Sequence, residues 1–190
     1  MSVTLRIATP GDATAIHEVY EFYIHHSVAT FNEVGRSVEY HRAFIEETLK
    51  TYPYLVAEDD GRFVGFANAE PVRPQTGYRY CVELTIYLHP DAPKHSGTGT
   101  LLYSRLLEIL TGQGFRIAYG VISGTNEESI GLHRRLGFEE VARFRQSGYK
   151  HSMWLDAVWM QKTLNPFDKA PALPIPFSEY RKGLGAFGEG

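Results

Sequence analysis

Hydrophobic positions along the chain change their spacing several times, and each spacing predicts a helix or a strand. Apolar residues recur every three or four positions over residues 16–24 and again over 40–52, which places them on one face of a helix. Asp12 and Ser37 stand where the N-caps of these helices would lie. Short apolar or alternating runs predict strands at residues 5–7, 54–58 and 63–70, the last two joined by a glycine-containing turn typical of an antiparallel hairpin.

The second half of the chain alternates strands and helices. Residues 80–88 are rich in β-branched and aromatic side chains and predict a long central strand, which ends before Pro90. A glycine loop then opens a helix that ends near Gly112, and residues 117–122 form the next predicted strand. If these two strands are neighbours in one sheet, the helix between them requires them to run parallel. A short helix at 127–136 and strands at 141–148 and 155–164 follow.

The hydrophobic pattern ends near Leu164. The remaining residues contain four of the chain's ten prolines and a glycine-rich end, without a helical or strand period. We therefore expect one domain over residues 1–164 and an irregular tail over 165–190, which either wraps the core or is partly mobile.

Composition excludes several classes of function. The 190 residues carry a formal net charge of -3, so no basic surplus favours nucleic acid or an anionic membrane surface. No apolar run is long enough to span a membrane, and the N-terminus lacks a signal-peptide layout. A single cysteine excludes an internal disulfide and a thiolate metal cluster. We expect a cytoplasmic protein that needs no metal.

The first segment that suggests chemistry is the glycine loop between the central strand and the following helix. Two glycines let the backbone approach a ligand closely, and the helix N-terminus offers unpaired N–H groups, so a pyrophosphate would fit. A plain glycine turn is the alternative, and for an isolated G-x-G it is the usual one. The loop contains Lys94, His95, Ser96, Gly97, Thr98, Gly99 and Thr100.

Two further segments hold polar residues of interest. Glu83 lies within the apolar central strand, where it either faces solvent on the alternate face or is held where its charge is used. Asn126 precedes the short helix and is a candidate cap for it. His133 lies within that helix, and the ordinary structural interpretation is a histidine packed in the core.

These segments recur in an order and spacing that resemble the GNAT acetyltransferase superfamily, and within it the phosphinothricin N-acetyltransferase (methionine sulfoximine or sulfone acetyltransferase) group. The superfamily loop Q/R-x-x-G-x-G/A matches residues 94–99, with lysine at its first position. The group's motifs S-x-A-T-F, Y-P-x-L-V-A-E, V-E-x-S/T-V/I-Y-V/L, N-x-x-S-I-x-L-H-x-x-L-G-F and G-x-K-x-x-x-W-x-D match residues 27–31, 52–58, 82–88, 126–138 and 148–156.

The resemblance implies an α/β fold with a mixed, mostly antiparallel central sheet, splayed where acetyl-CoA binds and flanked by helices. It implies that the backbone of Ile86, Tyr87 and Leu88 pairs with the pantetheine arm, that residues 94–100 hold the pyrophosphate and that Asn126 touches the cofactor arm. Glu83 would be the general base, because an ammonium has no lone pair until a proton is removed. His133 would be the acid for the leaving thiolate or would position the substrate.

The resemblance also implies an acceptor and an assembly. Donors for the acceptor's anionic groups would come from Arg73, Gln75, Tyr78 and Lys150, with Phe31 shaping the pocket; for Arg73 and Lys150, a solvated surface group is an equal alternative. The expected acceptor is a small amino-acid-like amine, and members of the group are often homodimers. Two alternatives are acetylation of a peptide N-terminus or polyamine, and a non-catalytic acyl-CoA-binding sensor.

Overall fold

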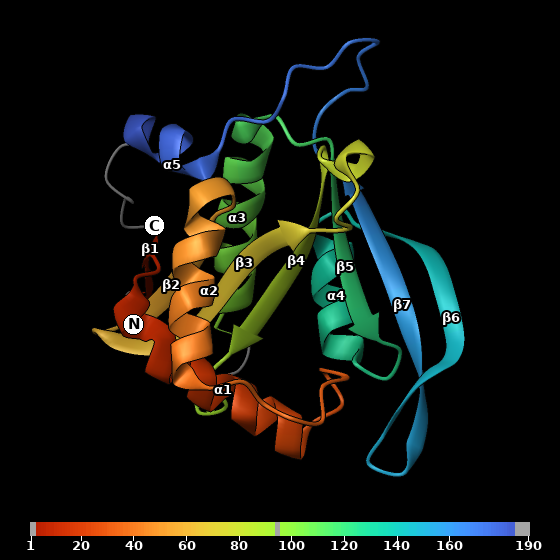
Figure 1. Ribbon diagram of the computed structural model, residues 1–190. Coiled ribbons are helices and arrows are strands. Elements are labelled where there is room, and N and C mark those ends of the chain that lie inside the picture. Colours follow the sequence, from red (N-terminus) through yellow and green to blue (C-terminus); the bar gives the residue numbers. More distant parts are fainter. Residues whose placement is uncertain (1–2, 94–95, 185–190) are drawn as a thin grey trace.

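A single seven-stranded sheet organises the chain in the computed structural model, which describes residues 3–93 and 96–184 (Figure 1). The strand order is β1-β2-β3-β4-β5-β7-β6. The strands are β1 (Val3–Ile7), β2 (Tyr54–Asp59), β3 (Arg62–Pro71), β4 (Cys81–Leu88), β5 (Ile117–Ser123), β6 (Glu139–Lys150) and β7 (Met153–Thr163).

All neighbouring strands are antiparallel except β4 and β5, which pair in parallel. This confirms the mixed, mostly antiparallel sheet and the parallel strand-helix-strand unit expected from the sequence. The predicted hairpin is also confirmed: Asp60 and Gly61 connect β2 to β3 with φ of 50° and 77°. Two consecutive residues with positive φ form the tight turn that matches the twist of an antiparallel pair.

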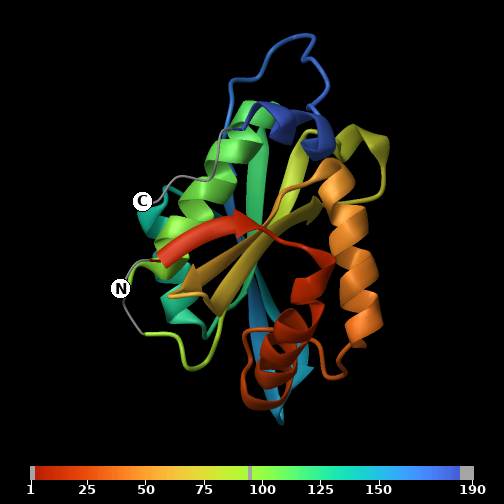
Figure 2. The same ribbon diagram turned by 90° about the vertical axis from the view of Figure 1, so that its left-hand side faces the viewer.

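Helices cover both faces of the sheet (Figure 2). On one face lie α1 (Ala13–His26) and α2 (Val38–Thr51), and on the other lie α3 (Thr98–Gln113) and α4 (Glu127–Arg135). Each face has its own buried cluster. Val56 and Phe66 pack with Ile16 of α1 on one side, whereas Leu106 of α3 packs against strand residues on the other. Burial of these apolar stripes is what holds the helices on the sheet.

Both predicted N-cap residues stand at the start of their helices, and one of the two makes the capping hydrogen bond. Ser37 caps α2, since its hydroxyl accepts a hydrogen bond from the amide of Tyr40 at 3.2 Å. Asp12 occupies the N-cap position of α1 as predicted, but its side chain makes no capping hydrogen bond to that helix. Its carboxylate instead accepts hydrogen bonds from the Arg6 guanidinium at 2.6 and 2.8 Å, and Arg6 also binds Glu58 on β2. Burial opposes it, but the bonds from Arg6 lower the pKa of Asp12. The same carboxylate also accepts a hydrogen bond from the backbone amide of Thr9 at 2.7 Å.

The segment after β7 departs from the expected irregular tail. Residues 165–176 contain no helix or strand, but Phe177–Tyr180 form helix α5 and Arg181–Gly183 form a 3-10 turn. Gln113 at the end of α3 fixes the entry to α5, because its side chain donates to the carbonyl of Ile175 at 2.7 Å and its carbonyl accepts from the Ile175 amide. Phe177 is fully buried in the main core. Phe177, Tyr180 and Leu184 therefore hold the last described part of this segment against the core.

No helix within the described residues is long and apolar enough to cross a membrane.

The burial of Phe177 allows a prediction of how much the segment after β7 contributes to stability. Phe177→Ala should lower the free energy of unfolding by about 3 to 5 kcal/mol, because it removes a fully buried ring and leaves a cavity. Phe167→Ala, at a site that is 69% exposed in the same segment, is the matched control and should change it by less than about 0.5 kcal/mol. Urea unfolding measures both values. Equal effects of the two substitutions would show that α5 is not docked on the core.

Candidate functional site

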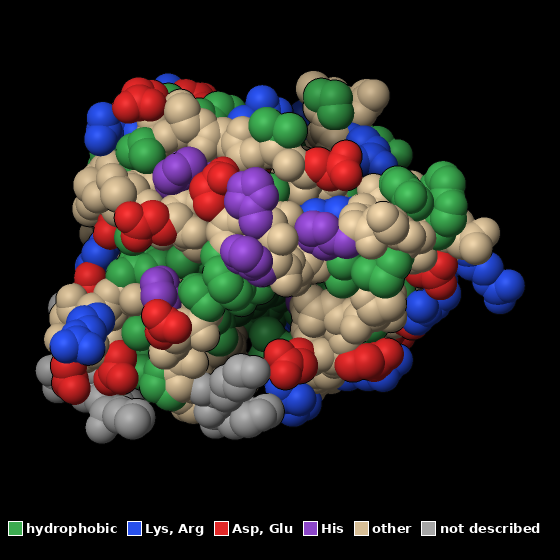
Figure 3. Space-filling view, turned by 90° about the horizontal axis from the view of Figure 1, so that it is seen from below, with side chains coloured by type: hydrophobic (Ala, Val, Ile, Leu, Met, Phe, Trp, Pro, Cys, Tyr) green, Lys and Arg blue, Asp and Glu red, His purple; other side chains and the backbone are tan. Residues whose placement is uncertain are grey.

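The parallel strands β4 and β5 stay together for a short distance only. They pair at three positions, Cys81 with Ile117, Val82 with Ala118 and Glu83 with Tyr119, and then diverge toward their C-terminal ends (Figure 1). A cleft of about 1150 Å³ occupies the gap, bordered by α1, the loop after it and the first turns of α3 and α4. Seen from below in Figure 3, the surface is hollowed here, with hydrophobic side chains inside. We call this the central cleft.

Strand β4 presents different groups to the two sides of the central cleft. Its side chains alternate between the faces of the sheet, so Glu83, Thr85 and Tyr87 share the face covered by α1. We call that side the acceptor half. The side formed by α3, α4 and β5 is the cofactor half.

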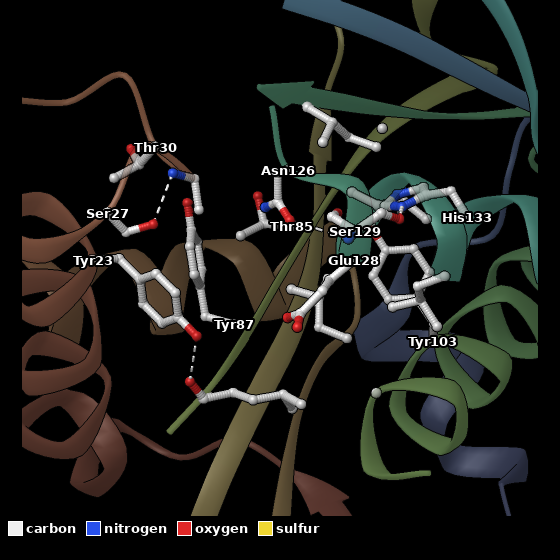
Figure 4. Close-up of a pocket in the computed structure, with 18 of the residues that line it drawn as sticks. Tyr23, Ser27, Thr30, Thr85, Tyr87, Tyr103, Asn126, Glu128, Ser129 and His133 are labelled. Atoms are coloured by element: carbon white, nitrogen blue, oxygen red, sulfur yellow. Dashed lines mark hydrogen bonds between the residues drawn. The ribbon is translucent and has the colours of Figure 1, made fainter. Parts of the chain in front are cut away.

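The backbone of β4 alternates as well. The amide of His89 donates to the carbonyl of Val64 on β3 at 2.9 Å. Successive residues of a strand direct their N–H and C=O groups to opposite edges, so Tyr87 faces β3 whereas Ile86 and Leu88 face the gap. Consistently, the carbonyl of Leu88 accepts a hydrogen bond from the Tyr23 hydroxyl at 3.0 Å across the cleft (Figure 4). The gap therefore exposes the unpaired edge of a strand.

The start of α3 offers backbone donors at the edge of the cofactor half. Gly97 is the N-cap residue, with φ of 84°, a conformation that glycine adopts without strain. As a glycine, the N-cap residue has no side chain to cap the helix, and the Ser96 hydroxyl accepts a hydrogen bond from the Thr98 amide at 3.5 Å. The amides of Gly99 and Thr100 thus lie at a helix N-terminus, which favours an anion such as a phosphate. Ser96, Gly97, Thr98, Gly99 and Thr100 all line the central cleft.

Helix α4 begins on the opposite wall of the cofactor half. The side-chain oxygen of Asn126 accepts a hydrogen bond from the Ser129 amide at 3.1 Å, which confirms the capping role. Among the described residues no hydrogen-bond partner is found for the amide nitrogen of Asn126, which leaves its two N–H groups for a bound group. Because Asn126 lines the cleft, capping and contact with a bound group are compatible.

His133 is nearly fully buried, and both of its ring nitrogens are engaged. Its Nδ1 lies 2.8 Å from the carbonyl oxygen of Ser129, which only accepts, so Nδ1 carries the proton. In the neutral ring Nε2 is then an acceptor, and the Tyr103 hydroxyl donates to it at 3.1 Å (Figure 4). Gly120 makes this placement possible, since a Cβ there would lie 2.4 Å from Nε2. Burial lowers the pKa of His133, which keeps the ring neutral near pH 7.

Glu83 lies at the last paired position of β4, on the acceptor half. It is half-buried and lines the cleft, which rejects the interpretation of a strand glutamate pointing to bulk solvent. Burial raises its pKa, the charge of Glu70 raises it further, and Arg73 opposes the shift. A carboxylate whose pKa is raised toward neutrality is a better proton acceptor than an ordinary glutamate.

The loop at residues 27–32 closes the acceptor half and is held by the β6–β7 hairpin. Lys150 is 1% exposed, and its ammonium donates to the carbonyls of Thr30 at 2.9 Å and Tyr23 at 3.4 Å. Phe31 packs against Gly148, where a Cβ would lie 2.6 Å from the ring. Phe31 lines the cleft as expected, but Lys150 lies behind the loop rather than among the cleft-lining residues. This geometry gives Lys150 a structural contact in place of the expected contact with substrate.

The remaining predicted residues fall into two groups. Arg73, Gln75 and Tyr78 are exposed in the connection between β3 and β4 and do not line the central cleft. The Arg73 guanidinium lies over the ring of Trp159, 5.5 Å from its centroid. Lys94 and His95 lie outside the described residues.

Among the cleft residues that were not sequence-based candidates, two contact or face a candidate residue directly. Glu70 is opposite Glu83 in the register of β3 and β4, and Tyr103 is the partner of His133. An acidic residue at the end of an otherwise apolar strand was the available signal for Glu70. For Tyr103, spacing indicated only the buried face of α3.

Comparison with known proteins identifies the fold family. Residues 5–159 match the acetyltransferase (GNAT) domain. An L-methionine sulfoximine/L-methionine sulfone acetyltransferase of Pseudomonas aeruginosa is 35% identical over 173 residues, which cover 90% of this chain and all of the relative. A putative acetyltransferase from Salmonella typhimurium, solved with acetyl-CoA, has a TM-score of 0.86 and 34% identity over 90% of this chain and 99% of its own. A phosphinothricin acetyltransferase from Sinorhizobium meliloti, solved with acetyl-CoA, has a TM-score of 0.84 and 36% identity; the match covers 95% of this chain and 100% of that chain.

The contacts of Lys150 allow a prediction about the stability of the loop at residues 27–32. Lys150→Met should raise the hydrogen-exchange rates of the amides at residues 27–32 by about tenfold or more, because two backbone carbonyls lose a buried charged donor. Lys50→Met, at an exposed position on α2, is the control. Unchanged exchange in the loop of Lys150→Met would show that the lysine does not hold it.

Proposed function

The chain belongs to the GNAT acetyltransferase family, and on this basis we propose that it transfers the acetyl group of acetyl-CoA to the amino group of a small amino-acid-like acceptor. The proposed acceptors are of the methionine sulfoximine, methionine sulfone or phosphinothricin type, after the names of the relatives. One observation carries the proposal: a half-buried glutamate with a raised pKa lies where the sheet opens into the cleft.

The residues of the cofactor half fit acetyl-CoA, which supplies the thioester carbonyl that the amine attacks. The amides of residues 99 and 100 at the start of α3 suit the pyrophosphate. The gap-facing backbone of Ile86 and Leu88 suits the amide groups of the pantetheine arm, as in the addition of a strand to a sheet edge. Asn126 has N–H groups to offer from α4. Lys94 and His95 remain predicted contacts.

Glu83 is the proposed general base. Amino-acid amines arrive as ammonium ions, so nucleophilic attack requires that a proton leave first. The raised pKa of Glu83 is closer to the pKa of the ammonium that gives up the proton, so the transfer is less unfavourable. The proton passes directly or through one water, and the free lone pair then attacks the thioester.

A backbone amide of β4 is the proposed donor to the thioester oxygen as it gains charge. The alternation of the strand favours the gap-facing amides of Ile86 and Leu88 over that of Tyr87. Such a donor is fixed before the reaction, so it stabilises the developing charge without reorganisation.

For His133 the geometry supports positioning over acid catalysis. Its one N–H group is given to Ser129, and its pKa is lowered, so the neutral ring has no proton ready for a thiolate. Instead, Nε2 of His133 orients the hydroxyl of Tyr103, which also lines the cleft.

Recognition of the acceptor's anionic groups is proposed for Arg73, Gln75 and Tyr78, which are exposed in the β3–β4 connection and lie outside the residues that line the central cleft. The charge of Arg73 reaches Glu83, as its effect on that pKa indicates. Phe31 would pack against the acceptor side chain.

We also propose a cytoplasmic homodimer. An unpaired Cys81 suits a reducing compartment. Large apolar side chains are exposed on the β6–β7 hairpin, including Phe144, Tyr149 and Trp154, which is typical of a surface that a partner covers. Sedimentation equilibrium of the pure protein gives the mass, and a monomer at micromolar concentration would reject the dimer.

Glu83→Gln tests the proposed function. The substitution should lower kcat by about 100-fold or more while acetyl-CoA affinity stays within about twofold, because it removes the base and leaves the cofactor half intact. Thiol release from acetyl-CoA with methionine sulfone, methionine sulfoximine and phosphinothricin measures the rate, and calorimetry measures the affinity. Glu139→Gln, on the exposed face of β6, is the control.

Two outcomes would contradict this account. Wild-type protein that binds acetyl-CoA but releases no thiol with any amine would indicate an acyl-CoA-binding sensor. Full activity of Glu83→Gln would show that another group accepts the proton.

A further inference from the structure

Glu70 of β3 lies directly opposite Glu83 of the neighbouring strand β4. The antiparallel register of β3 and β4 pairs the two residues directly, so their side chains emerge from the same face of the sheet. Both line the central cleft on its acceptor half. Like charges directly opposite each other on a sheet destabilise it. A positively charged group bound in the cleft would relieve this repulsion.

Asn68 fixes the Glu70 carboxylate. It is fully buried two residues before Glu70, on the same side of β3, and its Nδ2 donates to Glu70 Oε1 at 3.2 Å. The other end of this amide, Oδ1, is buried and has no hydrogen-bond partner within the part of the chain that the structure describes. The two carboxylates that line the cleft are acceptors, and among the described residues the hydrogen bonds give them one donor, Asn68, which serves Glu70. An ammonium ion supplies three donors and a positive charge.

Several other groups face the two carboxylates. Arg73, from the β3–β4 connection, lowers the pKa of Glu83, whereas Tyr103 of α3 is close enough to feel its charge. Tyr119 is its neighbour on β5. Around Glu70 are Tyr20 of α1 and Tyr54 of β2, whose raised pKa values each include a contribution from the Glu70 charge. The phenols remain neutral, so Arg73 is the cation nearby that the described residues provide.

We propose that Glu70 is an acceptor-binding residue, which holds the substrate's ammonium group together with Glu83. This inference rests on the proposed function and adds the part of the site that recognises the reacting nitrogen. Of the two carboxylates, Glu70 binds the ammonium and keeps its charge, whereas Glu83 takes the proton. The nitrogen lone pair then forms the C–N bond, and the C–S bond breaks with its electrons left on the CoA sulfur. The second proton that the nitrogen loses goes to this thiolate, which gives the amide and free CoA thiol.

The pair also explains why Glu83 is a good base. Burial raises the pKa of both carboxyls, and the bond from Asn68 opposes the rise for Glu70. The charge of Glu70 raises the pKa of Glu83 further, and Arg73 opposes that rise. Removing that charge should lower the pKa of Glu83 and move the acidic limb of the rate profile to lower pH, because activity is lost as pH falls through the pKa of the base.

The first test does not depend on activity. Carbon-13 NMR of the glutamate carboxyl groups gives the pKa of Glu83 in the wild type, Glu70→Gln and Glu70→Asp. We expect Glu70→Gln to lower this pKa by about one unit, and Glu70→Asp, which keeps the charge, to lower it by at most a few tenths. An unchanged pKa in Glu70→Gln would overturn the electrostatic part of the proposal.

The second test is kinetic. In Glu70→Gln the KM for methionine sulfone should rise at least tenfold, the KM for acetyl-CoA should stay within twofold, and the acidic limb of kcat/KM should shift with the NMR value. Glu139→Gln, the same substitution at an exposed position on β6, is the control and should leave both KM values unchanged. An acceptor KM within twofold of wild type would overturn the binding role.

The two tests separate this inference from the proposed function. If the wild type acetylates no amino acid but Glu70→Gln lowers the pKa of Glu83, the coupled pair is real and the proposed acceptor is wrong. If amino acids are acetylated while pKa and KM are unchanged in Glu70→Gln, the function stands and Glu70 has no part in it.

Discussion

The parting of β4 and β5 after three residue pairs is the feature on which the rest of the site depends. A parallel pair that continued to the ends of both strands would satisfy the backbone groups of residues 84–88 and fill the sheet. Because pairing stops, one edge of β4 is left without a strand partner in the middle of the protein. Such an edge is normally a liability, and here it lies inside a cleft where a ligand's amide groups can pair with it.

Packing on both sides keeps the gap open. On the cofactor half, His133 lies against Gly120 of β5, where a side chain would collide with it, and it is fixed by Ser129 and Tyr103. On the acceptor half, Tyr87 is enclosed by Tyr20 and Tyr23 of α1, with ring centroids 4.9 Å away in each case. Burial raises the pKa of Tyr87 to about 12, so this wall stays uncharged. The divergence is thus maintained by rigid neutral side chains.

One strand consequently serves two chemically different compartments. The backbone of residues 86 and 88 faces the gap, where the proposed cofactor arm needs hydrogen-bond partners. The side chains of Glu83, Thr85 and Tyr87 face the acceptor half, where an amine must lose a proton. Helix α3 adds the positive end of its dipole to the cofactor half, whereas Glu70 adds a negative charge to the acceptor half. The proposed reaction therefore combines groups that the strand's alternation keeps apart.

Local patterns in the sequence were sufficient for the features that depend on neighbours in the chain. The hairpin at Asp60, the cap at Ser37 and the glycine loop before α3 each follow from a few adjacent residues. Features set by distant residues were not predictable in this way. Lys150 binds a carbonyl 120 positions away, and Asp12 pairs with an arginine that also binds β2.

The two remaining misses have different physical causes. Helix α5 is four residues long, too short for a hydrophobic period to be visible. The pairing of Glu70 with Glu83 depends on the register of β3 and β4, which sequence spacing alone does not fix.

Amide hydrogen exchange along β4 tests the central claim most directly. In the protein without ligand, the amides of Ile86 and Leu88 should exchange faster than those of Thr85 and Tyr87, which face β3. Saturating acetyl-CoA should slow Ile86 and Leu88 at least tenfold and leave the other two nearly unchanged. Equal protection of all four amides before ligand is added, or no slowing afterward, would contradict an open strand edge that receives the cofactor.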